Sequence, residues 1–200
     1  MNNAKIITTK YVVLTLCYLP FLISIFKTFG FAGGLGANPI ETLLHSFGKN
    51  GLNLILITLA ITPIRRLTKL NFLIRLRRIL GLAAFFYILM HATVYVILDR
   101  ELIWQSIIED VSTRPYITLG FIALLLLIPL AITSTNNMQR LLKKKWAKLH
   151  QLIYLIAILG VIHYFWQVRI TTIEPIIYSL ILLILLTYRI NFYWKRRGRL

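Results

Sequence analysis

Six long apolar runs constrain this sequence more than any other feature. A helix needs about 17–25 mostly apolar residues to cross the hydrocarbon core of a bilayer. The runs do not alternate at period two, as the strands of a membrane barrel would. We therefore predict an all-α integral membrane bundle of six transmembrane helices. The expected spans are Tyr11–Phe29, Pro39–Ile64, Ile79–Leu98, Tyr116–Thr133, Leu149–Val168 and Glu174–Ile190.

The length of 200 residues favours one domain, residues 1–200, rather than several. Lys5 and Lys10 precede the first run and resemble the start of a signal peptide. No small-residue cleavage site follows cleanly, and further spans come after it, so we interpret the run as an uncleaved first helix.

The orientation follows from the loops. With the N-terminus in the cytoplasm, the inner segments carry 18 of the 23 basic residues. All six acidic residues fall on outer segments: Glu41, Asp99, Glu101, Glu109, Asp110 and Glu174. Cytoplasmic loops are enriched in Lys and Arg, so the pattern predicts that both termini are cytoplasmic.

Composition excludes several classes of function. The net charge is +17, but the basic residues lie between apolar runs, where they suit anionic lipid and not nucleic acid. The single cysteine, Cys17, excludes an intrachain disulfide and a cysteine-ligated metal cluster. No C-x-x-C-H motif is present, which excludes covalent c-type heme.

The ionisable groups within the spans are chiefly histidines. No Asp or Glu lies deep in a span, which argues against a proton pump or an ion-coupled transporter. His91 lies about 10 Å from the outer end of the third span, and His163 about 7 Å from the outer end of the fifth. Two imidazoles at similar depth on parallel helices suit a bis-histidine b-type heme. Hydrogen bonding of each histidine to a neighbouring helix is an equally good explanation of the spacing alone.

The other two histidines have different positions. His150 precedes His163 by 13 residues on the same expected helix, about 20 Å along the axis and about 140° around it. It is therefore a candidate ligand of a second, inner heme, although a solvated histidine at the inner boundary is also ordinary. His45 belongs to a polar stripe with Glu41, Lys49 and Asn53, which explains it without a metal.

Several motifs spread over nearly the whole chain together resemble one family, that of MsrQ, the heme-binding membrane subunit of the periplasmic protein-methionine-sulfoxide reductase system. The family is similar to the transmembrane domain of ferric reductases and NADPH oxidases. The motifs are Gly33–Arg66, Ile74–Leu82 leading to His91, Thr113–Gly120, Thr133–Leu155 and Ile162–Trp166.

The resemblance implies a multi-pass protein of the bacterial inner membrane, a ferric reductase-like transmembrane heme-binding domain. Heme b is the implied cofactor, with His91, His163 and His150 as axial ligands of the iron. The implied partner is a periplasmic molybdopterin methionine sulfoxide reductase catalytic subunit, which receives electrons to repair oxidised periplasmic proteins. FMN is a further cofactor that the resemblance suggests.

The sequence departs from the wider superfamily at one expected ligand position. The superfamily has a second histidine on the third helix, but here the positions 13 and 14 residues before His91 hold Arg78 and Arg77. The heme count of one or two therefore stays open. Arg77 and Arg78 are candidates to contact a heme propionate or the FMN phosphate.

Because ten residues follow the sixth span, we expect no flavin and nucleotide domain on this chain. The expected electron donor is therefore a separate cytoplasmic flavin reductase or a membrane quinol. Two alternatives remain: a stand-alone transmembrane ferric or quinone-linked cytochrome b, and a six-helix transporter without redox chemistry.

Overall fold

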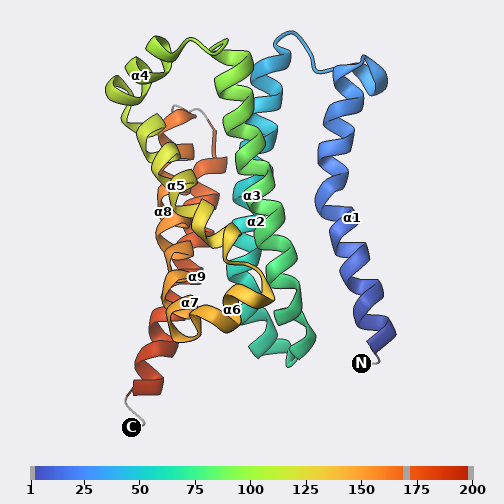
Figure 1. Ribbon diagram of the computed structural model, residues 1–200, viewed down its shortest axis with the longest axis vertical. Helices are drawn as coiled ribbons and strands as arrows, with labels where there is room; N and C mark the ends of the chain where they lie inside the picture. The colour runs from blue at the N-terminus through green and yellow to red at the C-terminus, as the bar shows by residue number, and fades with distance from the viewer. Residues whose placement is uncertain (1–2, 169–171, 198–200) are drawn as a thin grey trace. The chain divides into compact units, whose positions relative to one another are not determined.

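The computed structural model describes residues 3–168 and 172–197, and every regular element in these ranges is helical (Figure 1). Short 3-10 segments cover Phe31–Gly33 (η1) and Asn71–Leu76 (η2), and a π-helical segment covers Val94–Asp99 (η3). The α-helices are α1 Asn3–Thr28, α2 Pro39–Thr68, α3 Arg77–Thr93, α4 Trp104–Thr113, α5 Pro115–Ile132, α6 Asn136–Leu142, α7 Lys144–Leu149, α8 Leu152–Gln167 and α9 Glu174–Arg197.

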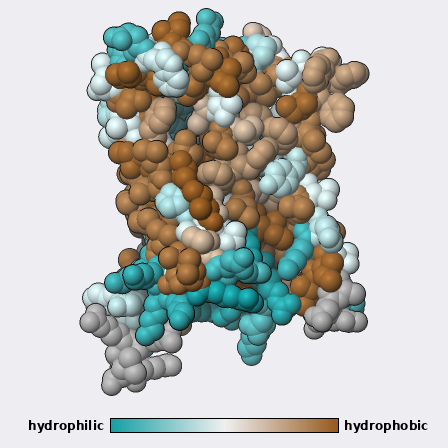
Figure 2. Space-filling model, viewed as in Figure 1, coloured by the Kyte–Doolittle hydropathy of each residue, from teal (hydrophilic) through white to brown (hydrophobic). Residues whose placement is uncertain are grey.

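Six helical stretches are long and apolar enough to cross a membrane, as the sequence predicted. They coincide with the six expected spans, although the first, second and sixth helices extend further toward basic residues than expected. Figure 2 shows apolar side chains over most of the visible helix surface, with hydrophilic side chains gathered below them. Large apolar side chains such as Leu183 and Ile184 are more than half exposed. Lipid is the environment that such a surface requires, so the chain is a multi-pass membrane protein.

The chain divides into two compact units. The first comprises Met1–Thr58 and Phe72–Pro115, and the second comprises Leu59–Asn71 and Tyr116–Leu200. The boundary falls within α2, which contributes its first part to one unit and its last part to the other.

In the first unit, α1 packs against α3 through aromatic side chains. The Phe21 ring lies edge-on to Phe86 at 4.9 Å and tilted against Phe47 at 5.7 Å. Tyr87 is fully buried, and its hydroxyl donates to the carbonyl of Cys17 at 2.8 Å and accepts from the amide of Phe21 at 3.0 Å. An unbroken helix would join those two backbone groups directly. Tyr87 therefore provides a hydrogen-bond partner for these two backbone groups of α1. They lie next to Pro20, whose missing N–H interrupts the hydrogen bonding of the helix.

In the second unit, α8 packs against α9. At one end of this pair the Tyr164 hydroxyl donates to Glu174 at 2.8 Å, and the Tyr164 and Tyr178 rings meet edge-on at 5.3 Å. The short helices α6 and α7 connect α5 to α8 (Figure 1).

His150 and His163 lie in one helical stretch, Lys144–Gln167, as expected, but a short turn interrupts it at His150. His150 follows the end of α7, and α8 begins at Leu152. The amide of Gln151 bonds to the carbonyl of Lys148, and the amide of Tyr154 to that of Gln151, so the chain tightens to i→i+3 bonding at this point. This turn changes the local rise and rotation from those of the regular α-helix assumed in the calculation of about 20 Å and about 140°.

Candidate functional site

His91 lies on α3 and contacts the backbone of α2. Its Nδ1 atom lies 2.8 Å from the carbonyl oxygen of Leu44. Gly48 follows Leu44 by one helical turn, and a Cβ at this glycine would lie 3.0 Å from the same nitrogen. The missing side chain therefore leaves the space that the imidazole ring occupies.

His163 has the same surroundings in the second unit. Its Nδ1 atom lies 2.7 Å from the carbonyl oxygen of Tyr116, the second residue of α5. Gly120 lies one turn further along α5, and a Cβ there would also be 3.0 Å from Nδ1. The carbonyl precedes the histidine by 47 residues in both units. We call each set of carbonyl, glycine and imidazole a histidine cradle.

The cradles determine the chemistry of the two imidazoles. A backbone carbonyl only accepts hydrogen bonds, so Nδ1 of each neutral ring carries the proton. The lone pair then lies on Nε2, which is the nitrogen that would bind a metal. Metal-binding histidines commonly donate their other nitrogen to a carbonyl in this way, which fixes the tautomer and the ring orientation. Both cradles therefore fit an axial iron ligand.

His150 has a different arrangement. Its Nε2 atom lies 3.1 Å from the Thr133 hydroxyl, which itself donates to the carbonyl of Pro129 at 2.6 Å. The hydroxyl has one proton, so it accepts from Nε2, and the lone pair of His150 lies on Nδ1. Trp146 stacks on the ring at 4.0 Å and donates its indole N–H to the carbonyl of Thr133. His150 would thus present Nδ1 to a metal, unlike the other two histidines.

The remaining predicted residues are His45, Arg77 and Arg78. His45 is exposed on α2, and its neighbour Leu44 provides the carbonyl that contacts His91. Arg77 is half-buried and Arg78 exposed at the start of α3, the helix that ends just beyond His91.

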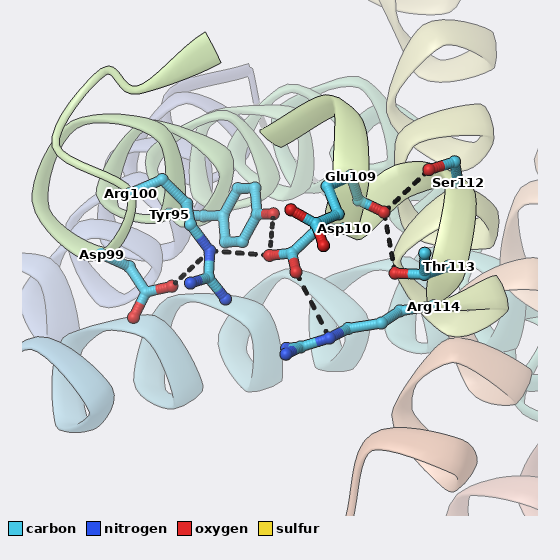
Figure 3. Close-up of polar contacts among 8 residues, drawn as sticks. All are labelled: Tyr95, Asp99, Arg100, Glu109, Asp110, Ser112, Thr113 and Arg114. Atoms are coloured by element: carbon cyan, nitrogen blue, oxygen red, sulfur yellow. Dashed lines mark hydrogen bonds and ion pairs between the residues drawn. The ribbon is translucent and has the colours of Figure 1, made fainter. Parts of the chain in front are cut away.

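A charged cluster on the first unit was not identified from the sequence (Figure 3). Asp110 is buried on the inward side of the amphipathic helix α4. Its carboxylate accepts a hydrogen bond from Tyr95 at 2.8 Å and forms ion pairs with Arg100 at 2.7 Å and Arg114 at 3.3 Å. Asp110 and Arg114 are spaced i, i+4, a signal for a local ion pair, but the contacts with Tyr95 and Arg100 required the fold.

The comparisons with known proteins agree with this architecture. The model of the family described as Ferric reductase like transmembrane component matches residues 48–161, which include His91 and His150. A protein-methionine-sulfoxide reductase heme-binding subunit MsrQ from Xanthomonas campestris pv. campestris is 51% identical over 162 residues, covering 81% of this chain and 73% of that protein. The MsrQ of Herminiimonas arsenicoxydans is 48% identical over 168 residues, covering 82% of this chain and 77% of that protein. The chain therefore belongs to the MsrQ family of ferric reductase-like transmembrane proteins.

Proposed function

We propose that this protein is a b-type cytochrome that carries electrons across the bacterial inner membrane to a methionine sulfoxide reductase. The two histidine cradles are the observation that carries this proposal. Each prepares one imidazole, in the first unit at His91 and in the second at His163, with Nε2 as the metal-binding nitrogen. The relatives named above are described as heme-binding subunits, which supports the same chemistry.

His91 and His163 are the proposed axial ligands of one heme b. When bound, such a heme supplies a one-electron centre whose potential depends on its axial ligands and their hydrogen bonds. The Leu44 and Tyr116 carbonyls hold the two rings in the required tautomer. Gly48 and Gly120 leave room for the rings.

His150 is the proposed ligand of a second heme, if the protein binds two. Its Nδ1 would face the iron while Thr133 holds Nε2. Arg77 and Arg78 remain proposed contacts of a heme propionate or of an FMN phosphate. Guanidinium groups suit either anion because their N–H groups pair with two oxygens at once.

The proposed orientation places both termini in the cytoplasm. In this orientation 18 of the 23 basic residues lie on cytoplasmic segments, as is usual for membrane proteins. Electrons would enter from a cytoplasmic flavin reductase or a membrane quinol and leave to the periplasmic molybdopterin subunit. A C-terminal green fluorescent protein fusion should fluoresce, and a C-terminal alkaline phosphatase fusion should be inactive. The reverse result would contradict the orientation.

Spectroscopy and reconstitution test the function. The purified protein should show a Soret band that shifts on reduction with dithionite. Proteoliposomes should then transfer electrons from a reduced flavin or quinol on the cytoplasmic side to the purified periplasmic reductase. A colourless protein, prepared from cells supplied with heme, would contradict the redox assignment.

The runner-up is a stand-alone ferric or quinone-linked cytochrome b, which the match to the ferric reductase-like family supports. The same proteoliposomes distinguish the two functions. Reduction of external ferric chelate, with no transfer to the methionine sulfoxide reductase, would favour the runner-up.

A further inference from the structure

The helix α4 is attached at both ends to the last turn of the span that precedes it. Near the end of α4, the Asp110 carboxylate accepts from the Tyr95 hydroxyl at 2.8 Å (Figure 3). Leu102 lies two residues before α4, and its amide donates to the carbonyl of Val96 at 2.9 Å. Tyr95 and Val96 are neighbours in η3, where the span Asn71–Asp99 ends. Because both ends of α4 are fixed to the same turn, the helix lies level with the end of the span.

Ion pairs fix the side of α4 that faces the first unit. Asp110 is buried and pairs with Arg100, just beyond the span, at 2.7 Å. Arg114, the residue after α4, pairs with the same carboxylate at 3.3 Å. Ile107, one turn before Asp110, is buried as well. The helix therefore cannot rotate about its axis without exposing Ile107 and breaking the ion pairs.

The other two sides of α4 differ in polarity. Trp104 and Ile108, spaced i, i+4, are 65% and 64% exposed and form an apolar side. Gln105, Glu109 and Ser112 form an exposed polar side. At about 100° per residue, the apolar side lies about 110° from the buried side and about 85° from the polar side. A helix that lies in the plane of a membrane surface has such an apolar side toward the lipid and a polar side toward water.

The apolar side of α4 continues the apolar surface of the span. Large apolar side chains are exposed in the last turn of the span, at Ile97 and Leu98, and again before α4, at Leu102 and Ile103. Trp104 follows directly, and tryptophan at the end of a span is typical of the headgroup level of a bilayer. The polar side of α4 points most directly away from the unit, so a soluble partner would meet that side first. Lipid is therefore the occupant that the apolar side fits.

We propose that α4 is an interfacial helix, seated in the headgroup region of the bilayer with Trp104 and Ile108 inserted among the acyl chains. Tryptophan suits this level because its ring is apolar while its N–H can donate to a headgroup or to water. Tyr95 lies one turn beyond His91 on the same span, so the seating of α4 also holds the end of the helix that carries this histidine. The proposal does not depend on heme binding.

Spin labels on α4, with the full-length protein in nanodiscs of phosphatidylethanolamine and phosphatidylglycerol, test this seating. Cys17→Ala removes the single native cysteine, so that each label is attached to one introduced cysteine. In Trp104→Cys and Ile108→Cys, collision of the label with molecular oxygen should exceed collision with a water-soluble nickel chelate several-fold. Gln105→Cys and Glu109→Cys are the matched controls, each one residue further along α4, and should show the reverse.

Two results of this experiment would overturn the proposal. Equal access of the nickel chelate to all four labels would show that Trp104 and Ile108 face water. Low access of both reagents to the labels that replace Trp104 and Ile108 would show that protein, and not lipid, covers this side of α4.

A measurement on the unmodified protein remains decisive even if the labelled variants do not fold. A phospholipid with a photoactivatable diazirine in the upper part of its acyl chain should label the peptide that contains residues 102–108. The peptide that contains Leu183 and Ile184, which are exposed on α9, is the positive control. Label on the control peptide but none on residues 102–108 would refute the interfacial position.

Discussion

The Nδ1 atom of His163 lies 2.7 Å from the carbonyl oxygen of Tyr116, and His91 repeats this relationship with Leu44 at 2.8 Å. A glycine one turn beyond each carbonyl makes room for the ring. Because the same arrangement occurs in both units, it is not a chance packing of one histidine.

Substitution of the cradle glycines should weaken heme binding. In Gly48→Ala or Gly120→Ala the new Cβ would lie 3.0 Å from Nδ1, so the ring must shift by a few tenths of an ångström against its carbonyl. Loss of such supporting contacts typically weakens metal binding roughly 10- to 100-fold. Heme affinity, measured by titrating the apoprotein with hemin, checks this expectation.

Gly81→Ala is the control for helix propensity. A Cβ at Gly81 meets nothing within 4 Å, so this change should leave heme binding intact. It should also stabilise α3 slightly, because Ala favours a helix by up to about 1 kcal/mol over Gly. Equal heme affinity in all three variants would show that the two cradle glycines do not support heme binding.

His91→Ala and His163→Ala should each lose most of the heme. Each removes one of two proposed axial ligands, and the pyridine hemochrome assay measures the heme per protein. His45→Ala should retain the wild-type heme content, because the His45 side chain is exposed. The carbonyl that contacts His91 belongs to the preceding residue, Leu44. Wild-type heme and an unchanged low-spin spectrum in both cradle variants would refute the assignment.

His150→Ala measures the number of hemes. If a second heme is bound, the heme content should fall by about half, while the spectrum of the remaining heme stays low-spin. Thr133→Val removes the acceptor of the Nε2 proton and should change the spectrum only if His150 ligates iron. No change in heme content or spectrum in either variant would establish that His150 has a structural role with Trp146.

Tyr87→Phe should destabilise the protein without removing heme ligands. The change leaves the Cys17 carbonyl and the Phe21 amide without their shared partner in a fully buried position. The expected loss is about 1–3 kcal/mol of unfolding free energy. Thermal unfolding in detergent checks it, with the exposed Tyr11→Phe as control. Equal midpoints for the two variants would show that α1 compensates internally.

Asp110→Asn should loosen the segment between α3 and α5. The amide can still pair with Tyr95, but it loses both ion pairs, with Arg100 and Arg114. A loss of about 2 kcal/mol is expected for charged hydrogen bonds at a nearly buried group. Hydrogen exchange of α4 should rise, whereas Asp99→Asn, at a more exposed carboxylate, should have little effect. Unchanged exchange in Asp110→Asn would show that α4 is held by its apolar contacts.

Some features of the fold were readable in the sequence because their cause is local. A helix that crosses lipid must satisfy its own backbone and present apolar side chains, so the length of each apolar run identifies a span. The same reasoning did not predict the short turn at His150 and Gln151, between α7 and α8. At this turn Trp146 and His150 both contact Thr133, which follows α5, and no local pattern encodes those contacts.

By itself, the sequence determined the six spans and the histidines that could serve as ligands, because hydropathy and residue chemistry are properties of each segment alone. Only the tertiary structure decided which nitrogen each histidine presents. A backbone carbonyl such as that of Leu44 has no signature in the sequence, and Gly48 resembles any other helical glycine until α3 lies against it. The tautomer of His91 is therefore set by a neighbour 47 residues away, and that neighbour exists only when the chain is folded.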